Sequence, residues 1–227
     1  MSEYDVYDEG NVYSESDVTH ALIREAGAAL ASESARLAAR GWMPGTSGNL
    51  SVTLARNPLW LGVTASGLDK GELTADDIVV VDDQGSWTDE PGLPYRLPSA
   101  EAGLHARIAA VTGAGAVIHV HALAAVRAGQ EWPKGVLLHD LEMLKGIGHR
   151  AHDERVTIPV VKNHQDMDLL GDEFERVYLQ PTDETAEVPA LIVANHGIYA
   201  WGADLRRARW HLELTEALLQ IALAARR

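Results

Sequence analysis

The spacing of apolar residues divides the chain into helical and extended segments. Between residues 17 and 40 they recur every three or four positions, as on one face of a helix, and Gly41 follows as a stop. The same spacing predicts helices over residues 99–111 and 204–224 and, in the segment VLLHDLEMLKGIG, over 136–148. We expect the buried stripe of the first helix to consist of Leu22, Ala26, Ala29, Leu30 and Leu37.

Shorter apolar runs bounded by glycine-rich loops predict β-strands. These runs cover residues 50–54, 59–64, 78–81, 116–122, 155–161 and 190–202. Helical and extended segments alternate without an internal repeat, a linker or a break in composition, so the sequence predicts one α/β domain over residues 17–227. Residues 1–16 are acidic and polar, and we expect them to form a disordered tail.

The composition limits both the chemistry and the partners. The 227 residues include no cysteine, so any metal must be held by histidine nitrogens and carboxylate oxygens. A formal net charge of −14 argues against nucleic acid and anionic membranes as partners. No apolar run approaches the length of a membrane span, and the N-terminus lacks the features of a secretory signal, so we expect a cytoplasmic protein.

Two histidines interrupt the apolar run AVIHVHA at residues 116–122. Alternate side chains of a strand share a face, so His119 and His121 are expected to point to one side while Val120 points into the core. His196 follows another apolar strand and precedes a glycine. Three histidines from two strand ends would leave a fourth coordination position open, as in catalytic zinc sites. Hydrogen-bonded core histidines are the alternative interpretation, and the third histidine favours the metal.

Two loops combine glycine with small hydroxyl residues. They are GTSGN at residues 45–49 and TASG at residues 64–67, and such loops can direct several backbone N–H groups toward one phosphate. Neither contains a Walker motif, and each taken singly is more typical of a plain turn. Ser99, predicted at a helix N-terminus, is a third candidate for binding an anion.

Two glutamates are candidates for acid–base chemistry. Glu101 is predicted in the first turn of its helix, where interaction with the helix dipole would explain it without catalysis. Glu142 lies beside the apolar stripe of its predicted helix, where solvation or a pair with Lys145 would explain it. The residues alone leave both roles open.

Several segments together resemble the class II, zinc-dependent aldolase-like proteins. In chain order they are GTSGNLSV, TASGLDKGEL, PSAEAGLHARI, GAGAVIHVHA and ANHGIYAWG. Within that family, LEMLKGI and the final HGIYAWG are similar to the methylthioribulose-1-phosphate dehydratases. The resemblance covers the chain from residue 17 onward. It implies a three-layer sandwich with a central mixed or antiparallel β-sheet flanked by helices, assembled as a homotetramer with active sites between subunits.

The resemblance also implies roles for individual residues. His119, His121 and His196 match the ligands of one zinc ion per subunit. Glu142 matches the acid/base residue of the dehydratases. Glu101 matches a metal-adjacent catalytic glutamate of the sugar-phosphate aldolases, a position where some dehydratases have cysteine. The positions that match the phosphate pocket are Ser47, Gly48, Asn49, Ser66, Gly67 and Ser99.

The reaction that this resemblance implies is the removal of water from 5-methylthioribulose 1-phosphate, a phosphorylated ketose of methionine salvage. The product would be 2,3-diketo-5-methylthiopentyl 1-phosphate. Because Glu101 follows the aldolase pattern, a class II sugar-phosphate aldolase or a pentulose-phosphate 4-epimerase is the alternative. A zinc-stabilised interaction protein without catalytic activity is a further alternative.

Overall fold

The computed structural model describes residues 18–88, 94–179 and 188–226. Within these residues, seven strands form one sheet in the order β3-β2-β1-β4-β9-β8-β7. Neighbouring strands are antiparallel except for β7 and β8, which are parallel. The strands are β1 (Asn49–Arg56), β2 (Leu59–Thr64), β3 (Ile78–Val81), β4 (Ala116–Val120), β7 (Val160–Val161), β8 (Ala190–Val193) and β9 (Gly197–Gly202). The expected tail over residues 1–16 lies outside the described residues.

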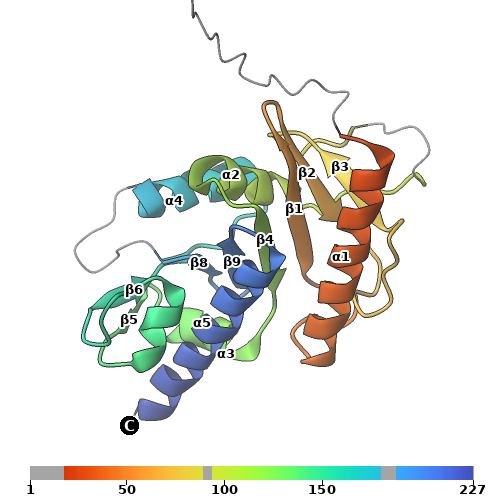
Figure 1. Ribbon diagram of the computed structural model, residues 1–227. Coiled ribbons are helices and arrows are strands. Elements are labelled where there is room, and N and C mark those ends of the chain that lie inside the picture. Colours follow the sequence, from red (N-terminus) through yellow and green to blue (C-terminus); the bar gives the residue numbers. More distant parts are fainter. Residues whose placement is uncertain (1–17, 89–93, 180–187, 227) are drawn as a thin grey trace, which may run out of the picture.

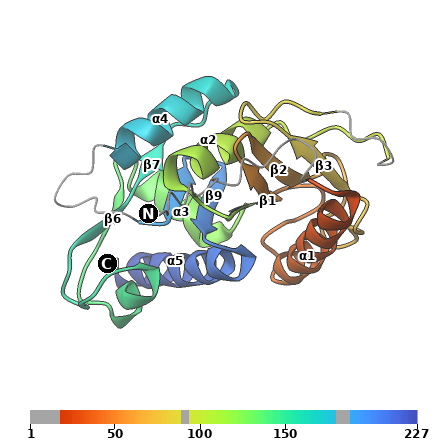
Figure 2. The same ribbon diagram turned by 45° about the horizontal axis from the view of Figure 1, so that its top comes forward.

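Helices cover both faces of this sheet, as Figures 1 and 2 show. Helices α1 (His20–Ala39), α3 (Leu123–Glu131) and α5 (Leu205–Ala225) pack on one face. Helices α2 (Ala102–Thr112) and α4 (Met167–Leu179) pack on the other. The predicted three-layer α/β arrangement with a mixed, mainly antiparallel sheet is therefore confirmed. None of the described helices is both long and apolar enough to span a membrane.

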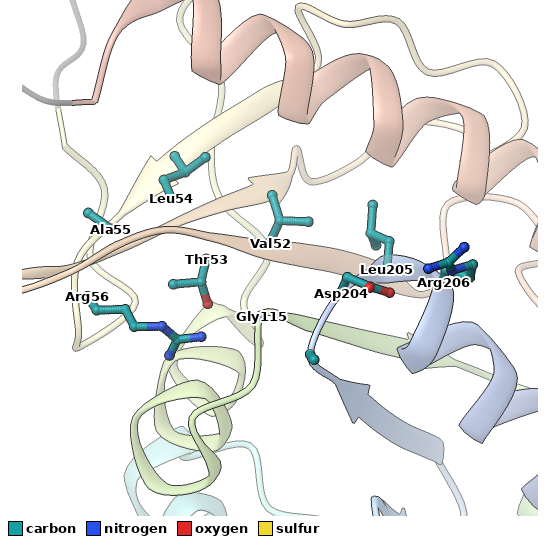
Figure 3. A pocket seen from close by; sticks show the side chains of 10 residues that line it. Val52, Thr53, Leu54, Ala55, Arg56, Gly115, Asp204, Leu205 and Arg206 are labelled. Atoms are coloured by element: carbon teal, nitrogen blue, oxygen red, sulfur yellow. The ribbon is translucent and has the colours of Figure 1, made fainter. Parts of the chain in front are cut away.

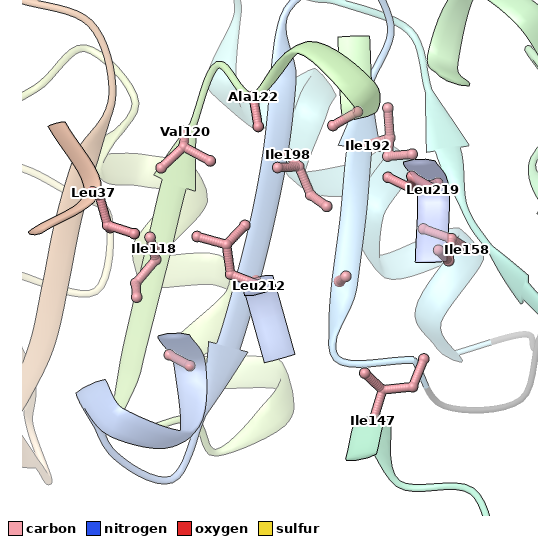
Figure 4. Packing of buried hydrophobic residues seen from close by; sticks show 14 of the residues in the cluster. Leu37, Ile118, Val120, Ala122, Ile147, Ile158, Ile192, Ile198, Leu212 and Leu219 are labelled. Atoms are coloured by element: carbon pink, nitrogen blue, oxygen red, sulfur yellow. The ribbon is translucent and has the colours of Figure 1, made fainter. Parts of the chain in front are cut away.

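The two faces of the sheet contribute to different hydrophobic cores. The core beneath α1 and α5, shown in Figure 4, includes Leu37, Ile118, Val120, Ile198 and Leu212. The core beneath α2 and α4 includes Leu104, Val117, Phe174, Leu191, Tyr199 and Trp201. Side chains alternate along β4, so His119 shares the face of Val117 and lies under α2, while Val120 points into the opposite core as expected.

The first helix is confirmed, but its buried stripe is rotated relative to the prediction. The buried residues are Ile23, Gly27, Leu30, Glu33, Ser34 and Leu37, and Ala29 is exposed. Gly27 packs so closely that a Cβ there would lie 2.1 Å from the carbonyl oxygen of Ala75. The helix can therefore approach the backbone at Ala75 only because residue 27 is a glycine. A search for apolar side chains does not find such a position.

The helix predicted over residues 136–148 is wrong over its first half. Val136–Leu138 forms β5, which pairs with β6 (Val156–Ile158) in a separate two-stranded sheet. Only Glu142–Ile147 is helical, as the short 3-10 helix η2. Asp140 between them has a φ of 56°, a left-handed conformation that a continuing helix does not allow.

Other boundaries shift for local reasons. The run predicted over residues 155–161 is divided at Pro159 into β6 and β7, which belong to different sheets. The helix predicted from residue 99 begins at Ala102, with Glu101 as its N-cap. The closing helix is confirmed, with the Asp204 side chain accepting a hydrogen bond from the Arg207 N–H at its start. Helices α3 and α4 were not predicted.

Candidate functional site

The site lies where β1, β4 and β9 run side by side under the N-terminus of α2. Asn49 of β1 is the cross-strand partner of His119 in β4, and His119 is the partner of Tyr199 in β9. These three side chains therefore form a row across one face of the sheet. Glu101 stands at the start of α2, on the helix that covers this face.

Three histidines converge at one end of this row. The Nε2 atoms of His119 and His121 lie 3.1 Å apart, and ring nitrogens of His119, His121 and His196 all lie within 4.8 Å of one another. Among the described residues, these three histidines form a group whose ligand atoms lie close enough together to hold one metal ion. The expected convergence of residues from two separate strand ends is present.

The hydrogen bond of His119 leaves its Nε2 free to act as a ligand. The Nδ1–H of His119 donates to the carbonyl oxygen of Ile198 at 3.1 Å, so Nε2 carries the lone pair that faces His121. Burial lowers the pKa of His119 to about 3, against the opposing effect of the Glu101 charge. Burial also lowers the pKa of His121. The rings of both histidines are therefore neutral at physiological pH.

This donor set fits a divalent metal. The Nε2 atoms of His119 and His121, 3.1 Å apart, are close enough either to share a proton or to bind one cation between them. Zinc–nitrogen bonds of about 2.0–2.1 Å in a tetrahedral site place neighbouring ligand atoms about 3.3 Å apart. Three imidazoles without a thiolate suit zinc and several other divalent transition metals. The three histidines therefore indicate a divalent transition metal without distinguishing zinc from the others.

Two glycines make room for the cluster. A Cβ on Gly197 would lie 2.3 Å from the carbonyl oxygen of Val120 and 3.1 Å from Cε1 of His119. Gly48 has a φ of 75°, and a Cβ there would lie 2.9 Å from the carbonyl oxygen of His119. Both strands that flank β4 can approach His119 this closely only because these positions lack a side chain.

His196 is placed by the turn between β8 and β9. Its N–H donates to the carbonyl oxygen of Val193 at 3.1 Å, and Asn195 before it adopts a left-handed conformation with a φ of 58°. The Nε2–H of Gln130, from α3, donates to Oδ1 of Asn195 at 3.0 Å. The helix that follows His121 thus also holds the turn that carries His196.

Glu101 is directed at the histidines rather than at its own helix. Its Oε1 lies 2.9 Å from Nε2 of His196 and 3.7 Å from Nε2 of His119, and its other oxygen accepts a hydrogen bond from Asn49. No capping hydrogen bond joins its side chain to the first turn of α2, so the helix-dipole explanation does not account for its placement. Burial would raise the pKa of Glu101, but the His196 hydrogen bond, the neighbouring His119 ring and the Asn49 amide together hold that pKa below its usual range.

A cavity of about 280 Å³ adjoins this cluster. The six residues expected to form a phosphate pocket all line it, together with Glu101 and His121: Ser47, Gly48, Asn49, Ser66, Gly67 and Ser99. Lys70, which the sequence pattern did not single out, lines it as well. The structure therefore gathers the two glycine loops, Ser99 and the histidine cluster around one space.

A family model for the class II aldolase and adducin N-terminal domain matches residues 28–223 of the chain. The chain belongs to the class II aldolase family.

Relatives within the class II aldolase family share most of their length with this chain. A methylthioribulose-1-phosphate dehydratase of Persephonella marina is 37% identical over 80% of this chain and 81% of its own length. A methylthioribulose-1-phosphate dehydratase of Acidiphilium cryptum is 37% identical over 89% of this chain and 95% of its own. Among solved structures, L-fuculose-1-phosphate aldolase from Thermus thermophilus has a TM-score of 0.65 at 22% identity, covering 90% of this chain and 95% of that one, which shows a shared fold.

In this class II aldolase family member, Glu142 is separate from the histidine cluster within one chain. Its side chain is 75% exposed on η2, and Oε1 accepts a hydrogen bond from Nζ of Lys145 at 2.8 Å. That pairing lowers the pKa of Glu142. Across the described residues, no hydrogen bond or ion pair joins Glu142 to the cluster or to Glu101. Its acid/base role stays a prediction.

A second, larger cavity of about 550 Å³ lies along β1 beyond its first residues, beside the start of α5. Figure 3 shows its apolar wall of Val52, Leu54 and Leu205. It contains no histidine, and its carboxylate, on Asp204, already caps α5. The histidine cluster instead adjoins the smaller cavity, which His121 lines.

Two residues of the site were missed by the sequence analysis. Tyr199 is fully buried and stacks on the His119 ring, with centroids 4.1 Å apart and planes 16° apart. Strand alternation, which places residues 197, 199 and 201 on one face, was the available signal. Lys70 had no signal of this kind, because burial of a loop lysine does not follow from its neighbours in sequence.

Proposed function

We propose that this protein is a zinc-dependent dehydratase that converts 5-methylthioribulose 1-phosphate to 2,3-diketo-5-methylthiopentyl 1-phosphate and water. The observation that carries the proposal is the 37% identity, over four-fifths of both chains, to a protein named for that activity. The site supports it chemically, because the three histidines lie together beside the Glu101 carboxylate, and Glu101 and His121 line a cavity bounded by the hydroxyl and glycine loops.

One zinc ion per subunit would be held by His119, His121 and His196. Bound there, it would supply Lewis acidity that stabilises negative charge on the ketone oxygen and the adjacent carbon. Ile198 orients the His119 ring through its carbonyl oxygen, and Tyr199 stacks on that ring. These contacts fix the direction of one donor nitrogen before any substrate enters.

The carboxylate nearest the histidines is placed to move the protons. Dehydration removes a proton from the carbon next to the ketone, releases the hydroxyl of the following carbon as water, and leaves an enol that becomes the second ketone. Glu101 lines the cavity beside the histidines, so its position allows it to accept the first proton and return it to the departing hydroxyl, once substrate replaces the His196 hydrogen bond that lowers its pKa. We propose Glu142 as a second acid/base group, which must separate from Lys145 to take part.

The glycine loops are proposed to hold the phosphate end of the substrate. Gly48 and Gly67 have positive φ values, so the loops at residues 45–49 and 64–67 turn sharply toward the cavity. An anchored phosphate would keep the ketone end fixed against Glu101 and the three histidines, which increases the rate by positioning.

The proposal is tested by identifying the product. The zinc-loaded protein is incubated with 5-methylthioribulose 1-phosphate and, separately, with fuculose 1-phosphate, and the products are identified by mass. We expect a product lighter than the methylthio substrate by one water and no cleavage of fuculose 1-phosphate. Cleavage of fuculose 1-phosphate without dehydration would establish the aldolase alternative instead. Turnover of neither compound by zinc-loaded protein would contradict both enzymes.

The assembly and location expected from the sequence stay predictions. A homotetramer with active sites between subunits is consistent with Leu123, which is 78% exposed although it lies two residues from His121. We expect a mass in solution close to four times 24.6 kDa by analytical ultracentrifugation. We also propose that the enzyme works in the cytoplasm.

A further inference from the structure

Lys70 is a buried ammonium group without an acidic partner. Its side chain is among the largest that are fully buried, with 1% of the residue exposed. Nζ donates to the carbonyl oxygens of Leu68 at 2.8 Å and Thr46 at 3.1 Å. Among the described residues, no carboxylate lies within ion-pair distance of it, because neighbouring Asp69 accepts from the Gly71 N–H instead. Burial lowers the pKa of Lys70 more than the opposing charges of Asp69 and Glu101 raise it.

A buried cation is costly unless an anion or several acceptors surround it. An ammonium group has three donors, and the two carbonyl oxygens use two of them. Both acceptors are neutral, so they satisfy hydrogen bonds without neutralising the charge. Lys70 also lines the cavity of about 280 Å³, so an anion inside that cavity is the partner within its reach.

Two of the hydroxyl groups around the same cavity have partners of their own. The Ser47 hydroxyl donates to the carbonyl oxygen of Pro44 at 2.8 Å. The Ser99 oxygen accepts from the Asn49 amide at 2.9 Å and from the Glu101 N–H at 3.3 Å. The Ser47 and Ser99 hydroxyls are therefore already engaged, and a charged donor beside the glycine loops would bind a doubly charged oxyanion more strongly than neutral donors alone.

We propose that Lys70 is the specificity-determining cation of this site, pairing with the phosphate group of the substrate. Lys70 also connects the two glycine loops, because it donates to Thr46 in one loop and to Leu68 directly after the other. Lys70 thereby holds the two loops together around the anion. The inference rests on the proposed function for the identity of the whole substrate, but binding of a phosphate group can be measured without turnover.

The test measures the affinity of the zinc-loaded full chain for inorganic phosphate by calorimetry. Lys70→Met keeps the length of the side chain and removes the charge, and Lys70→Arg keeps the charge. Lys134→Met, at an exposed position, is the matched control. We expect Lys70→Met to weaken phosphate binding at least about tenfold. Lys70→Arg should bind more tightly than Lys70→Met, and Lys134→Met should match the wild type, with equal zinc content in all four proteins.

Kinetics separates binding of the anion from damage to the site. With 5-methylthioribulose 1-phosphate, Lys70→Met should raise KM at least about tenfold while kcat falls much less, because the interaction is made equally in the ground state and transition state. Phosphate affinity in Lys70→Met equal to that of the control would overturn the proposal. Normal phosphate binding through Lys70 without any dehydration would contradict the proposed function and leave this inference standing.

A measurement on the unaltered protein covers the case in which Lys70→Met does not fold. Crystals of the zinc-loaded wild type are soaked with tungstate, an anomalous scatterer shaped like phosphate. A tungstate peak with an oxygen within hydrogen-bond distance of Lys70 Nζ supports the proposal. Tungstate bound in the cavity against other groups, or no bound tungstate at saturating concentration, overturns it.

Discussion

Gly197 is the residue on which the closeness of the histidines depends. A Cβ at this position would meet the Val120 carbonyl oxygen at 2.3 Å and His119 Cε1 at 3.1 Å, so Gly197→Ala must push β9 away from β4. We expect a loss of about 1–3 kcal/mol in the free energy of unfolding, the usual cost of overpacking. Bound zinc should fall below one per subunit by elemental analysis. Gly103→Ala is the control, because the nearest atom to its Cβ is 3.3 Å away and belongs to a side chain. Full zinc content in Gly197→Ala would show that β9 adjusts without moving the ligands.

Each of the two candidate glutamates predicts a loss of turnover when it is replaced by glutamine. Glu101→Gln should lower kcat for dehydration at least about a hundredfold, the usual scale for a general base. Glu142→Gln should do the same while zinc content and phosphate affinity stay normal, if its exposed carboxylate reaches the substrate. Glu25→Gln, exposed on α1, controls for loss of negative charge. Near-normal turnover in either variant, measured with zinc content, removes that residue from the mechanism.

His105 predicts a pH dependence of stability. It is fully buried, its Nδ1 pairs with the Ser51 hydroxyl at 2.8 Å, and burial lowers its pKa from 6.5 to about 4. Below pH 6.5 the unfolded chain therefore binds a proton at His105, while the folded chain does not bind one until the pH nears 4. The contribution of neutral His105 to the free energy of unfolding is fully present above pH 6.5 and is lost as the pH falls toward 4. Between pH 7 and pH 5 this amounts to roughly 2 kcal/mol. Denaturant unfolding should show a smaller pH dependence in His105→Gln, whereas His20→Gln, at an exposed position, should match the wild type.

At the scale of elements, α3 begins directly after His121 and is fixed by a residue of another helix. The Glu216 carboxylate, buried on α5, accepts hydrogen bonds from the N–H groups of Ala124 and Ala125, both at 3.1 Å. Glu216→Ala leaves both donors buried without a partner, which should cost about 1–3 kcal/mol. Hydrogen exchange should then increase in α3 more than in α1. Glu213→Ala, on the same helix but paired with Arg40 instead, is the control. Unchanged protection of α3 would show that the cap is dispensable.

The sequence predicted the side-chain directions at the site better than the limits of its strands. Period-2 alternation in AVIHVHA predicted His119 and His121 on one side and Val120 in the core, as found, but β4 ends at Val120 and the run over 190–202 is divided into β8 and β9 at the turn that carries His196. The segment over residues 136–148 was mispredicted because its apolar spacing fits a helix, while Asp140 adopts a left-handed conformation that spacing does not register. Glu101 and Lys70 depended on tertiary contacts with residues distant in the chain, His196 and Thr46, and local patterns contain no such information.

At the scale of the whole molecule, both hydrophobic cores are built from apolar side chains that pack without the metal. One core packs α1 and α5 against the sheet and the other packs α2 and α4, which His119 meets through Tyr199. Removing the metal should therefore stop the reaction without unfolding the chain. In contrast, small domains with structural zinc unfold when the metal is removed.

Chelation tests this separation of fold and chemistry. After dialysis against dipicolinate, we expect no turnover, an unchanged far-UV circular dichroism spectrum and a lower Tm, because zinc at about 1,000 times its Kd stabilises the folded state by about 4 kcal/mol. One equivalent of zinc should restore both turnover and Tm in wild type. In His121→Ala it should restore neither, since two imidazoles are left to hold the ion. Loss of the circular dichroism signal on chelation would instead make the histidine cluster a structural centre, because the cores alone would then be too weak to hold the sheet.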